Sequence, residues 1–153
     1  MAGDFLDTSA LAKHYHPEVG SAVVDRLWND LGRDLFVSRL AALEIISAFA
    51  GKVRGGVISL TDFDTLRRRF AFDLSKKKRP IGTRILVAHF QEAERLLRQH
   101  GPTHRLRTLD ALQLAVALDL HQKNAVDQFV SADKDLLVVA ALEGIAILDP
   151  ESP

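Results

Sequence analysis

The sequence has 153 residues, a length that fits one domain with one hydrophobic core. Its 20 Lys and Arg balance its 20 Asp and Glu, which excludes the overall basic field of a non-specific nucleic-acid coat. The lack of Cys excludes disulfides, thiolate chemistry and zinc sites built on Cys. No signal-peptide pattern, repeat, linker or apolar stretch of roughly 18 residues is present, so we expect a cytoplasmic protein without a membrane segment and a single domain over residues 1–150.

The chain begins with a short apolar run that ends on an acid and turns directly into a helical pattern. Phe5 and Leu6 precede Asp7, and the helical spacing continues to about Tyr15. The carboxyl ends of parallel strands form the sheet edge where ligands bind, which favours Asp7 as a site residue. An Asp before Thr-Ser is also a good helix N-cap, so Asp7 taken alone leaves both interpretations open.

This order of strand and helix repeats along the chain. Further β-prone runs are expected at residues 35–37, 128–133 and 145–148. Helical patterns are expected at about residues 17–31, 40–50, 59–72, 86–97, 106–118 and 134–143. The alternation predicts an α/β fold, with a central parallel sheet of about four or five short strands flanked by helices on both faces.

Two of these helices are apolar nearly all round, and each carries a single acid: Glu44 in the first and Asp110 near the start of the second. A carboxylate in such a place costs several kcal/mol unless it is paired or binds a cation. Glu44 could form an ion pair with Arg39 or another arginine, or it could lie on a narrow strip of the helix that faces solvent. The more specific interpretation is that Glu44 is a metal ligand or a proton-transfer group. The helix dipole would favour Asp110 by under about 1 kcal/mol, but it does not explain the apolar turn around it.

Asp133 ends the run at 128–133 as Asp7 ends the first run, so all four acids can meet at one edge of the sheet. Carboxylates that lie close together repel one another unless a cation joins them. Mg²⁺ or Mn²⁺ takes oxygen ligands and keeps open positions for water and phosphate oxygens. Such a site suits hydrolysis of phosphodiester bonds.

A basic run follows the helix at 59–72, and it consists of Lys76, Lys77, Lys78 and Arg79. A charge run is usually a solvated loop. Beside an acidic site that needs a polyanionic substrate, it becomes a candidate contact with a phosphate backbone.

The segment after Pro80 and Gly82 predicts a long amphipathic helix that ends at Gly101. No catalytic role is needed to explain it. Its histidines and the one that follows are expected at the surface or at helix ends, because no pair has the spacing of a metal site on a helix. They are His89, His100 and His104.

Four segments resemble, in order, the four acidic motifs of the PIN-domain family, most of all those of its VapC-type toxin ribonucleases. They are residues 5–11 (FLDTSAL), 43–48 (LEIISA), 109–115 (LDALQLA) and 130–136 (VSADKDL). The match covers nearly the whole chain. One motif alone would be weak, but four in order are specific.

The resemblance implies a metal-dependent endoribonuclease that is the toxin of a type II toxin–antitoxin pair. It implies a single PIN-like domain in which Asp7, Glu44, Asp110 and Asp133 form the acidic pocket for Mg²⁺ or Mn²⁺. Supporting hydroxyls would come from Thr8, Ser9 and Ser131. It also implies a homodimer, a cognate antitoxin partner and an RNA substrate. The basic run is not a family motif, so its assignment to RNA rests on charge alone.

Two other classes of protein are considered. A phosphatase that forms an aspartyl phosphate needs a second Asp two residues after the first, where this chain has Ser9. A catalytically silent PIN-like module would keep the fold and bind RNA or protein. The presence of all four acids argues against it, because a lost activity would permit at least one of them to change.

Overall fold

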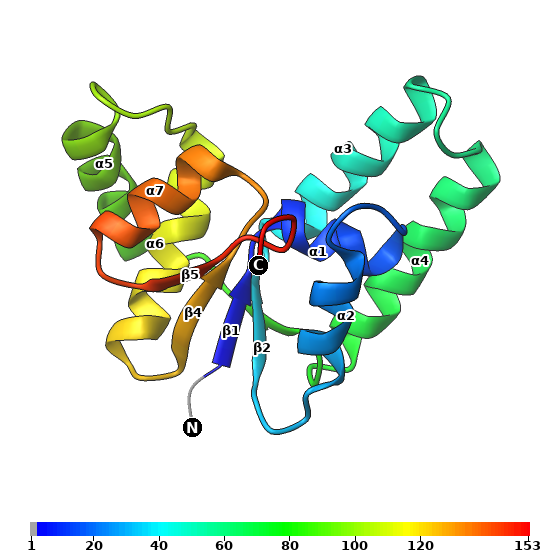
Figure 1. The fold of residues 1–153 in the computed structure, drawn as a ribbon, viewed down its shortest axis with the longest axis horizontal. Helices are drawn as coiled ribbons and strands as arrows, with labels where there is room; N and C mark the ends of the chain where they lie inside the picture. The colour runs from blue at the N-terminus through cyan, green and yellow to red at the C-terminus, as the bar shows by residue number, and fades with distance from the viewer. Residues whose placement is uncertain (1–2) are drawn as a thin grey trace.

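The computed structural model describes residues 3–153 and contains one sheet of five parallel strands in the order β3-β2-β1-β4-β5. The strands are β1 (Gly3–Leu6), β2 (Leu35–Ser38), β3 (Ile81–Thr83), β4 (Val126–Val130) and β5 (Ala146–Leu148). The helices are α1 (Thr8–Tyr15), α2 (Ser21–Asn29), α3 (Ala41–Arg54), α4 (Leu60–Ser75), α5 (Val87–His100), α6 (Thr108–Gln122) and α7 (Lys134–Leu142). Figure 1 shows α1 to α4 on one side of the sheet and α5 to α7 on the other, which confirms the predicted fold. Within residues 3–153, none of these helices has the length and apolar character needed to cross a membrane.

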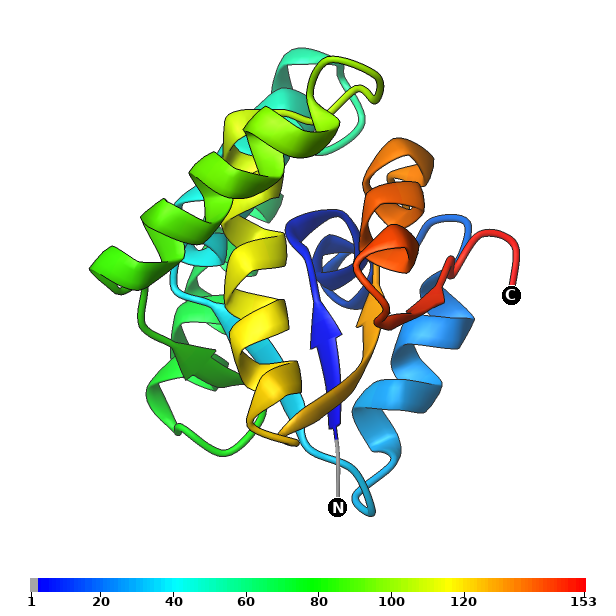
Figure 2. The same cartoon turned by 90° about the vertical axis from the view of Figure 1, so that its left-hand side faces the viewer.

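Side chains along the inner strands alternate between the two faces of the sheet. Phe5 pairs in register with Phe36 and Phe129, and all three belong to the core formed with α5, α6 and α7. The next residues in β1 and β4, Leu6 and Val130, belong to the other core, formed with α1 to α4. Both faces of the sheet are therefore buried, as parallel sheets require. Figure 2 shows α5 and α6 lying across one of these faces.

Strand β3 is absent from the sequence prediction, which places a helix directly after Pro80 and Gly82. The strand lies at the sheet edge, where Ile81 pairs with Phe36 of β2. Three residues around a central glycine are too few for an alternating pattern to be recognised. Packing there is tight, since a Cβ at Gly82 would lie 2.8 Å from Cδ1 of Leu74 in α4 and would require that side chain to shift.

One buried acid lies at the amino end of the sheet, away from the predicted site. Asp4 is fully buried in β1 and accepts hydrogen bonds from Nη2 (2.9 Å) and Nε (3.1 Å) of Arg33. The same guanidinium also pairs with Asp127. A buried carboxylate held by an arginine in this way needs no functional explanation.

His89 and His100 lie in the first and last turns of α5, as the expectation of helix ends allows, but both are buried. His89 accepts a hydrogen bond from the backbone N–H of Leu86 through Nδ1 (2.9 Å), and its Nε2 lies 3.0 Å from Asp119. The Nε2 of His100 lies 2.6 Å from Glu143. These contacts tie α5 to α6 and α7, so both rings have structural partners.

Candidate acidic site

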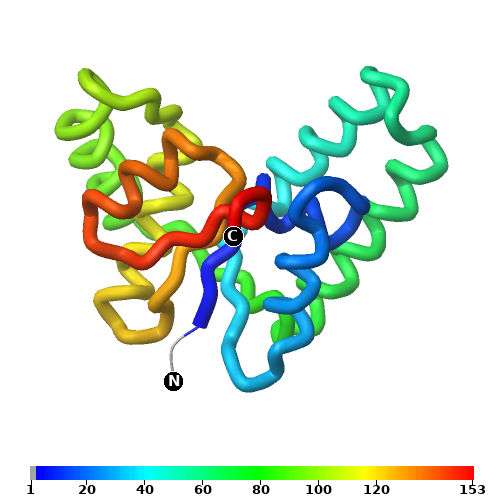
Figure 3. Tube along the Cα trace, viewed as in Figure 1, coloured from blue at the N-terminus to red at the C-terminus, as the bar shows by residue number. Residues whose placement is uncertain are grey.

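The four acids reach the same end of the sheet from four different helices. Asp7 follows β1 and caps α1, while Asp133 follows the neighbouring strand β4 and caps α7. Glu44 and Asp110 lie in the first turns of α3 and α6. All four therefore sit at helix N-termini, whose partial positive charge favours anions. Figure 3 shows the two helical layers spreading apart beyond these strand ends.

Asp7 is both a helix cap and the most buried of the four acids, with 5% of its surface exposed. Its Oδ1 accepts hydrogen bonds from Ser9 Oγ (2.7 Å) and from the backbone N–H of Ala10 (2.9 Å), and its Oδ2 accepts from Ser131 Oγ (2.6 Å). Burial raises the pKa of Asp7 to about 6, helped by the nearby charge of Asp133 and opposed by these hydrogen bonds.

The hydroxyls of Ser9 and Ser131 join the first acidic segment to the last. Ser9 Oγ accepts a hydrogen bond from the backbone N–H of Ala132 (3.0 Å), and Ser131 Oγ accepts one from that of Asp133 (3.0 Å). The Asp133 carboxylate itself accepts from two backbone N–H groups of α7. Asp7 and Asp133 are thus held in fixed positions by one connected network.

Glu44 is half-buried and accepts hydrogen bonds from Thr8 Oγ1 (3.3 Å) and Gln113 Nε2 (2.8 Å). Within the described part of the chain it forms no ion pair with an arginine, so the interpretation with Arg39 is wrong. Gln113 was missed by the sequence analysis. The sequence pattern around Gln113 resembles that around the acids, because Gln113 is a polar residue within an otherwise apolar stretch of helix.

Asp110 lies within range of the charges of the other three acids. Burial raises the pKa of Asp110 to about 6. The charges of three other acids contribute to the rise, in decreasing order Asp133, Asp7 and Glu44. The nearby Arg107 acts in the opposite direction, but among residues 3–153 no side chain or backbone group donates a hydrogen bond to the Asp110 carboxylate. It therefore differs from Asp4, whose arginine partner makes it a structural residue.

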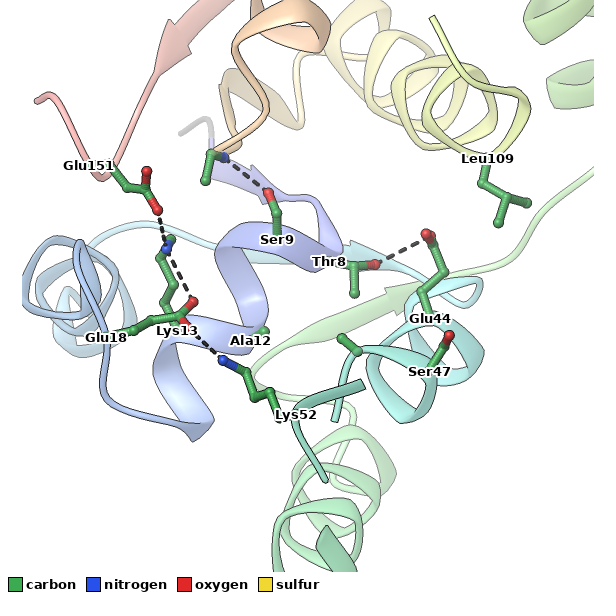
Figure 4. A pocket seen from close by; sticks show the side chains of 12 residues that line it. Thr8, Ser9, Ala12, Lys13, Glu18, Glu44, Ser47, Lys52, Leu109 and Glu151 are labelled. Carbon is green, nitrogen blue, oxygen red and sulfur yellow. Dashed lines mark hydrogen bonds and ion pairs between the residues drawn. The ribbon is translucent and has the colours of Figure 1, made fainter. Parts of the chain in front are cut away.

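A pocket of about 550 Å³ opens beside the cluster (Figure 4). Glu44 lines it, and the other acids adjoin lining residues in the sequence, namely Thr8, Leu109 and Ala132. The opposite wall is charged: Lys13 pairs with Glu18 (3.1 Å) and Glu151 (2.7 Å), and Lys52 pairs with Glu18 (2.7 Å). These pairs bring the C-terminal segment after β5 against α1.

The chemistry of the cluster fits a hard divalent cation. Its donors are carboxylate oxygens, and the Asp110 carboxylate, whose pKa is raised by burial and by the other three acids, accepts no hydrogen bond within residues 3–153. Across residues 3–153, no three His, Cys, Asp or Glu side chains already stand in metal-binding positions. Mg²⁺ does not need such a trio, because it usually keeps several waters and takes one or two carboxylates.

The basic run precedes β3 and therefore lies at the amino end of the sheet, opposite to the strand ends that Asp7 and Asp133 follow. Lys76, Lys77 and Lys78 are exposed. Arg79 is not available in the same way, because its guanidinium donates to backbone carbonyl oxygens at the end of α2 and in the loop that follows. These are the carbonyls of Leu27, Trp28, Asp30 and Arg33. Arg79 thus has a structural role, while the RNA contact of the lysines stays a prediction.

The fold and the placement of the acids define a PIN domain. The PIN domain family model matches residues 5–142, so the chain belongs to this family. No curated protein matches the sequence.

Several solved structures share the fold. VapC20 of Mycobacterium tuberculosis, a sarcin-ricin loop cleaving toxin, is 17% identical with a TM-score of 0.67, over 94% of this chain and 97% of that one. FitAcB of Neisseria gonorrhoeae is 16% identical with a TM-score of 0.64, over 98% and 99%. PAE2754 of Pyrobaculum aerophilum is 18% identical with a TM-score of 0.64, over 99% and 91%. At these identities the likeness establishes the fold.

Proposed function

We propose that this PIN domain is a metal-dependent endoribonuclease, with Asp7, Glu44, Asp110 and Asp133 as the acids that hold Mg²⁺ or Mn²⁺. The observation that carries the proposal is the placement of the four acids at the N-caps or in the first turns of four helices. Acids from four separate segments come together there, and within residues 3–153 none of them forms an ion pair with an arginine as Asp4 does with Arg33. A divalent cation relieves the repulsion among them.

The chain's own residues would prepare the site for an RNA phosphodiester. The chemistry that the cation supplies when bound is activation of a water and stabilisation of charge on the leaving oxygen. Ser9 and Ser131 hold the buried Asp7 carboxylate, and Thr8 contacts Glu44. The N-termini of α1, α3, α6 and α7 surround the site and favour a bound phosphate.

We further propose that the protein is a cytoplasmic toxin of a type II pair, a homodimer held by a cognate antitoxin. Support comes from the family and from the names of its structural neighbours, which include VapC20 and a VapBC-5 toxin–antitoxin protein of Mycobacterium tuberculosis. The second neighbour has a TM-score of 0.55. Co-expression with a gene adjacent to its own, followed by size-exclusion chromatography, tests both the partner and the dimer.

The nuclease is tested by incubating purified protein with a mixed RNA pool, with Mn²⁺ and with EDTA. We expect internal cleavage with Mn²⁺ only. The alternative, a catalytically silent binding module, is favoured by the lack of a ready trio of ligands among residues 3–153. Intact RNA that stays bound to the protein in Mn²⁺ would support that alternative.

We also propose that Lys76, Lys77 and Lys78 contact the RNA backbone away from the cleaved bond. Changing all three to Ser should flatten the salt dependence of RNA binding by roughly 0.7 in log–log slope for each phosphate of a single strand that a lysine no longer neutralises. Turnover at saturating RNA should not change, because a contact made equally in ground and transition states affects KM alone. Arg79 is left in place because of its structural bonds, and Lys123→Ser serves as the control. An unchanged salt dependence of RNA binding in the triple variant would mean that the three lysines belong to an ordinary solvated loop and do not contact RNA.

A further inference from the structure

Gln113 lies at the point where both helical layers meet the end of the sheet. It belongs to α6, and only 1% of its surface is exposed. Its amide makes hydrogen bonds to three other elements: to Ser38 at the end of β2 (2.9 Å), to Thr8 at the start of α1 (3.1 Å) and to Glu44 in α3 (2.8 Å). Since α3 and α6 lie on opposite faces of the sheet, the amide connects the two layers just beyond the strands.

The orientation of this amide follows from its partners. A carboxylate only accepts hydrogen bonds, so the nitrogen of Gln113 must face Glu44. The amide oxygen then faces Ser38, whose hydroxyl donates to it. The remaining amide N–H reaches Thr8, and the Thr8 hydroxyl in turn donates to Glu44 (3.3 Å). Glu44 Oε1 therefore receives two hydrogen bonds from groups that also bind each other.

The same helix carries Asp110, three residues before Gln113. Residues three apart lie on the same side of a helix, so α6 presents Asp110 and Gln113 toward the same region. Asp110 and Glu44 are like charges when both are ionised and then repel each other, whereas Gln113 binds Glu44 through a hydrogen bond. The amide thus opposes the separation that repulsion between the two carboxylates would cause.

A purely structural role gives a weaker account of these hydrogen bonds. The rest of the buried face of α6 is apolar, and an apolar residue at 113 would pack there without any need for partners. A buried amide is costly unless every group in its network is satisfied. Two of its three partners, Thr8 and Glu44, line the pocket beside the acids, and the third is the Ser38 hydroxyl at the end of β2.

We propose that Gln113 is a positioning residue that fixes Glu44 against Thr8 and so sets the separation of the Glu44 and Asp110 carboxylates for cation binding. Ser38 holds the amide in the orientation that this requires. The inference rests on the proposed function, because it concerns the same acidic site. It adds Gln113 and Ser38, to which the family resemblance assigns no role at the site.

The test is the affinity for Mn²⁺, measured without RNA from the rise in melting temperature as Mn²⁺ is added. Gln113→Met keeps the length of the side chain and removes the amide. We expect it to weaken Mn²⁺ binding by about 10- to 100-fold, as is usual when a residue that orients a metal ligand is replaced. In a Glu44→Ala background, the same change should alter the affinity by less than about threefold, because Gln113 then has no carboxylate at 44 to orient. The exposed Gln122→Met, at the end of the same helix, is the matched control and should leave the affinity unchanged.

An equal fall in affinity in both backgrounds, or parental affinity in Gln113→Met, would overturn the proposal. If Gln113→Met does not fold, Ser38→Ala decides: it keeps the amide but removes its anchor, and should weaken Mn²⁺ binding by about two- to tenfold. Parental affinity in Ser38→Ala would then overturn the proposal. Failure of the proposed function looks different, since the parent protein itself would bind no Mn²⁺ and cut no RNA.

Discussion

Asp110→Asn is expected to abolish metal-dependent RNA cleavage while the protein stays folded. The Asp110 carboxylate faces the charges of the other acids and, within residues 3–153, has no hydrogen-bond donor, so its charge is best explained by a bound cation. Asp7→Asn should have the same effect. We expect a decrease of more than about 100-fold in each, since replacing even a residue that only orients a metal ligand costs about 10- to 100-fold.

The measurement is the initial rate of cleavage with saturating Mn²⁺, accompanied by the melting temperature in EDTA. Asp135→Asn is the matched control, because this acid also lies in the first turn of α7 but is exposed and outside the cluster. It should cleave at the parental rate. Cleavage by Asp110→Asn at the parental rate would show that this residue is not a ligand.

Each of the four acids interrupts a clear local pattern, which is why the sequence alone draws attention to them. Asp7 and Asp133 each follow a β-prone run, and the parallel sheet brings the ends of those runs together. Glu44 and Asp110 stand out as single acids in apolar helices. Their meeting point is set by the order of the strands, which a local pattern does not contain.

Contacts between distant segments explain what the sequence analysis missed. The partners of Arg79 are backbone carbonyls in and after α2. No local sequence pattern could therefore show that Arg79 differs in role from the three exposed lysines before it. His89 is buried because Asp119 lies opposite on α6. Gln113 has the same type of signal as Asp110, but glutamine suggests no metal chemistry, and its three partners come from three other elements.

Without metal, the protein is expected to become more stable as the pH falls from about 7.5 to 5. The pKa of Asp7 is raised to about 6 in the folded state, from an ordinary value of 3.8. Between these values the folded state binds more protons than the unfolded state, so the free energy of unfolding decreases as the pH rises. Between pH 7.5 and 5 the buried Asp7 alone accounts for about 1.4 kcal/mol, or about 3–6 °C in melting temperature. In EDTA at pH 7.5, Asp7→Asn should therefore be more stable than the parent, with a flatter pH dependence.

Mn²⁺ should reverse this trend, because it binds the deprotonated carboxylates and competes with protons. At a hundredfold excess over Kd it stabilises the folded state by about 2.7 kcal/mol, an effect expected near pH 7.5 and absent once the pH falls well below about 6. The measurement is the melting temperature across this pH range with Mn²⁺ and with EDTA. Glu44→Gln should show a smaller rise with Mn²⁺, because it keeps acceptor oxygen for Thr8 and Gln113 but loses its charge. Equal rises in the parent and in this variant would mean that Glu44 serves the Thr8 and Gln113 hydrogen bonds alone and takes no part in binding the cation.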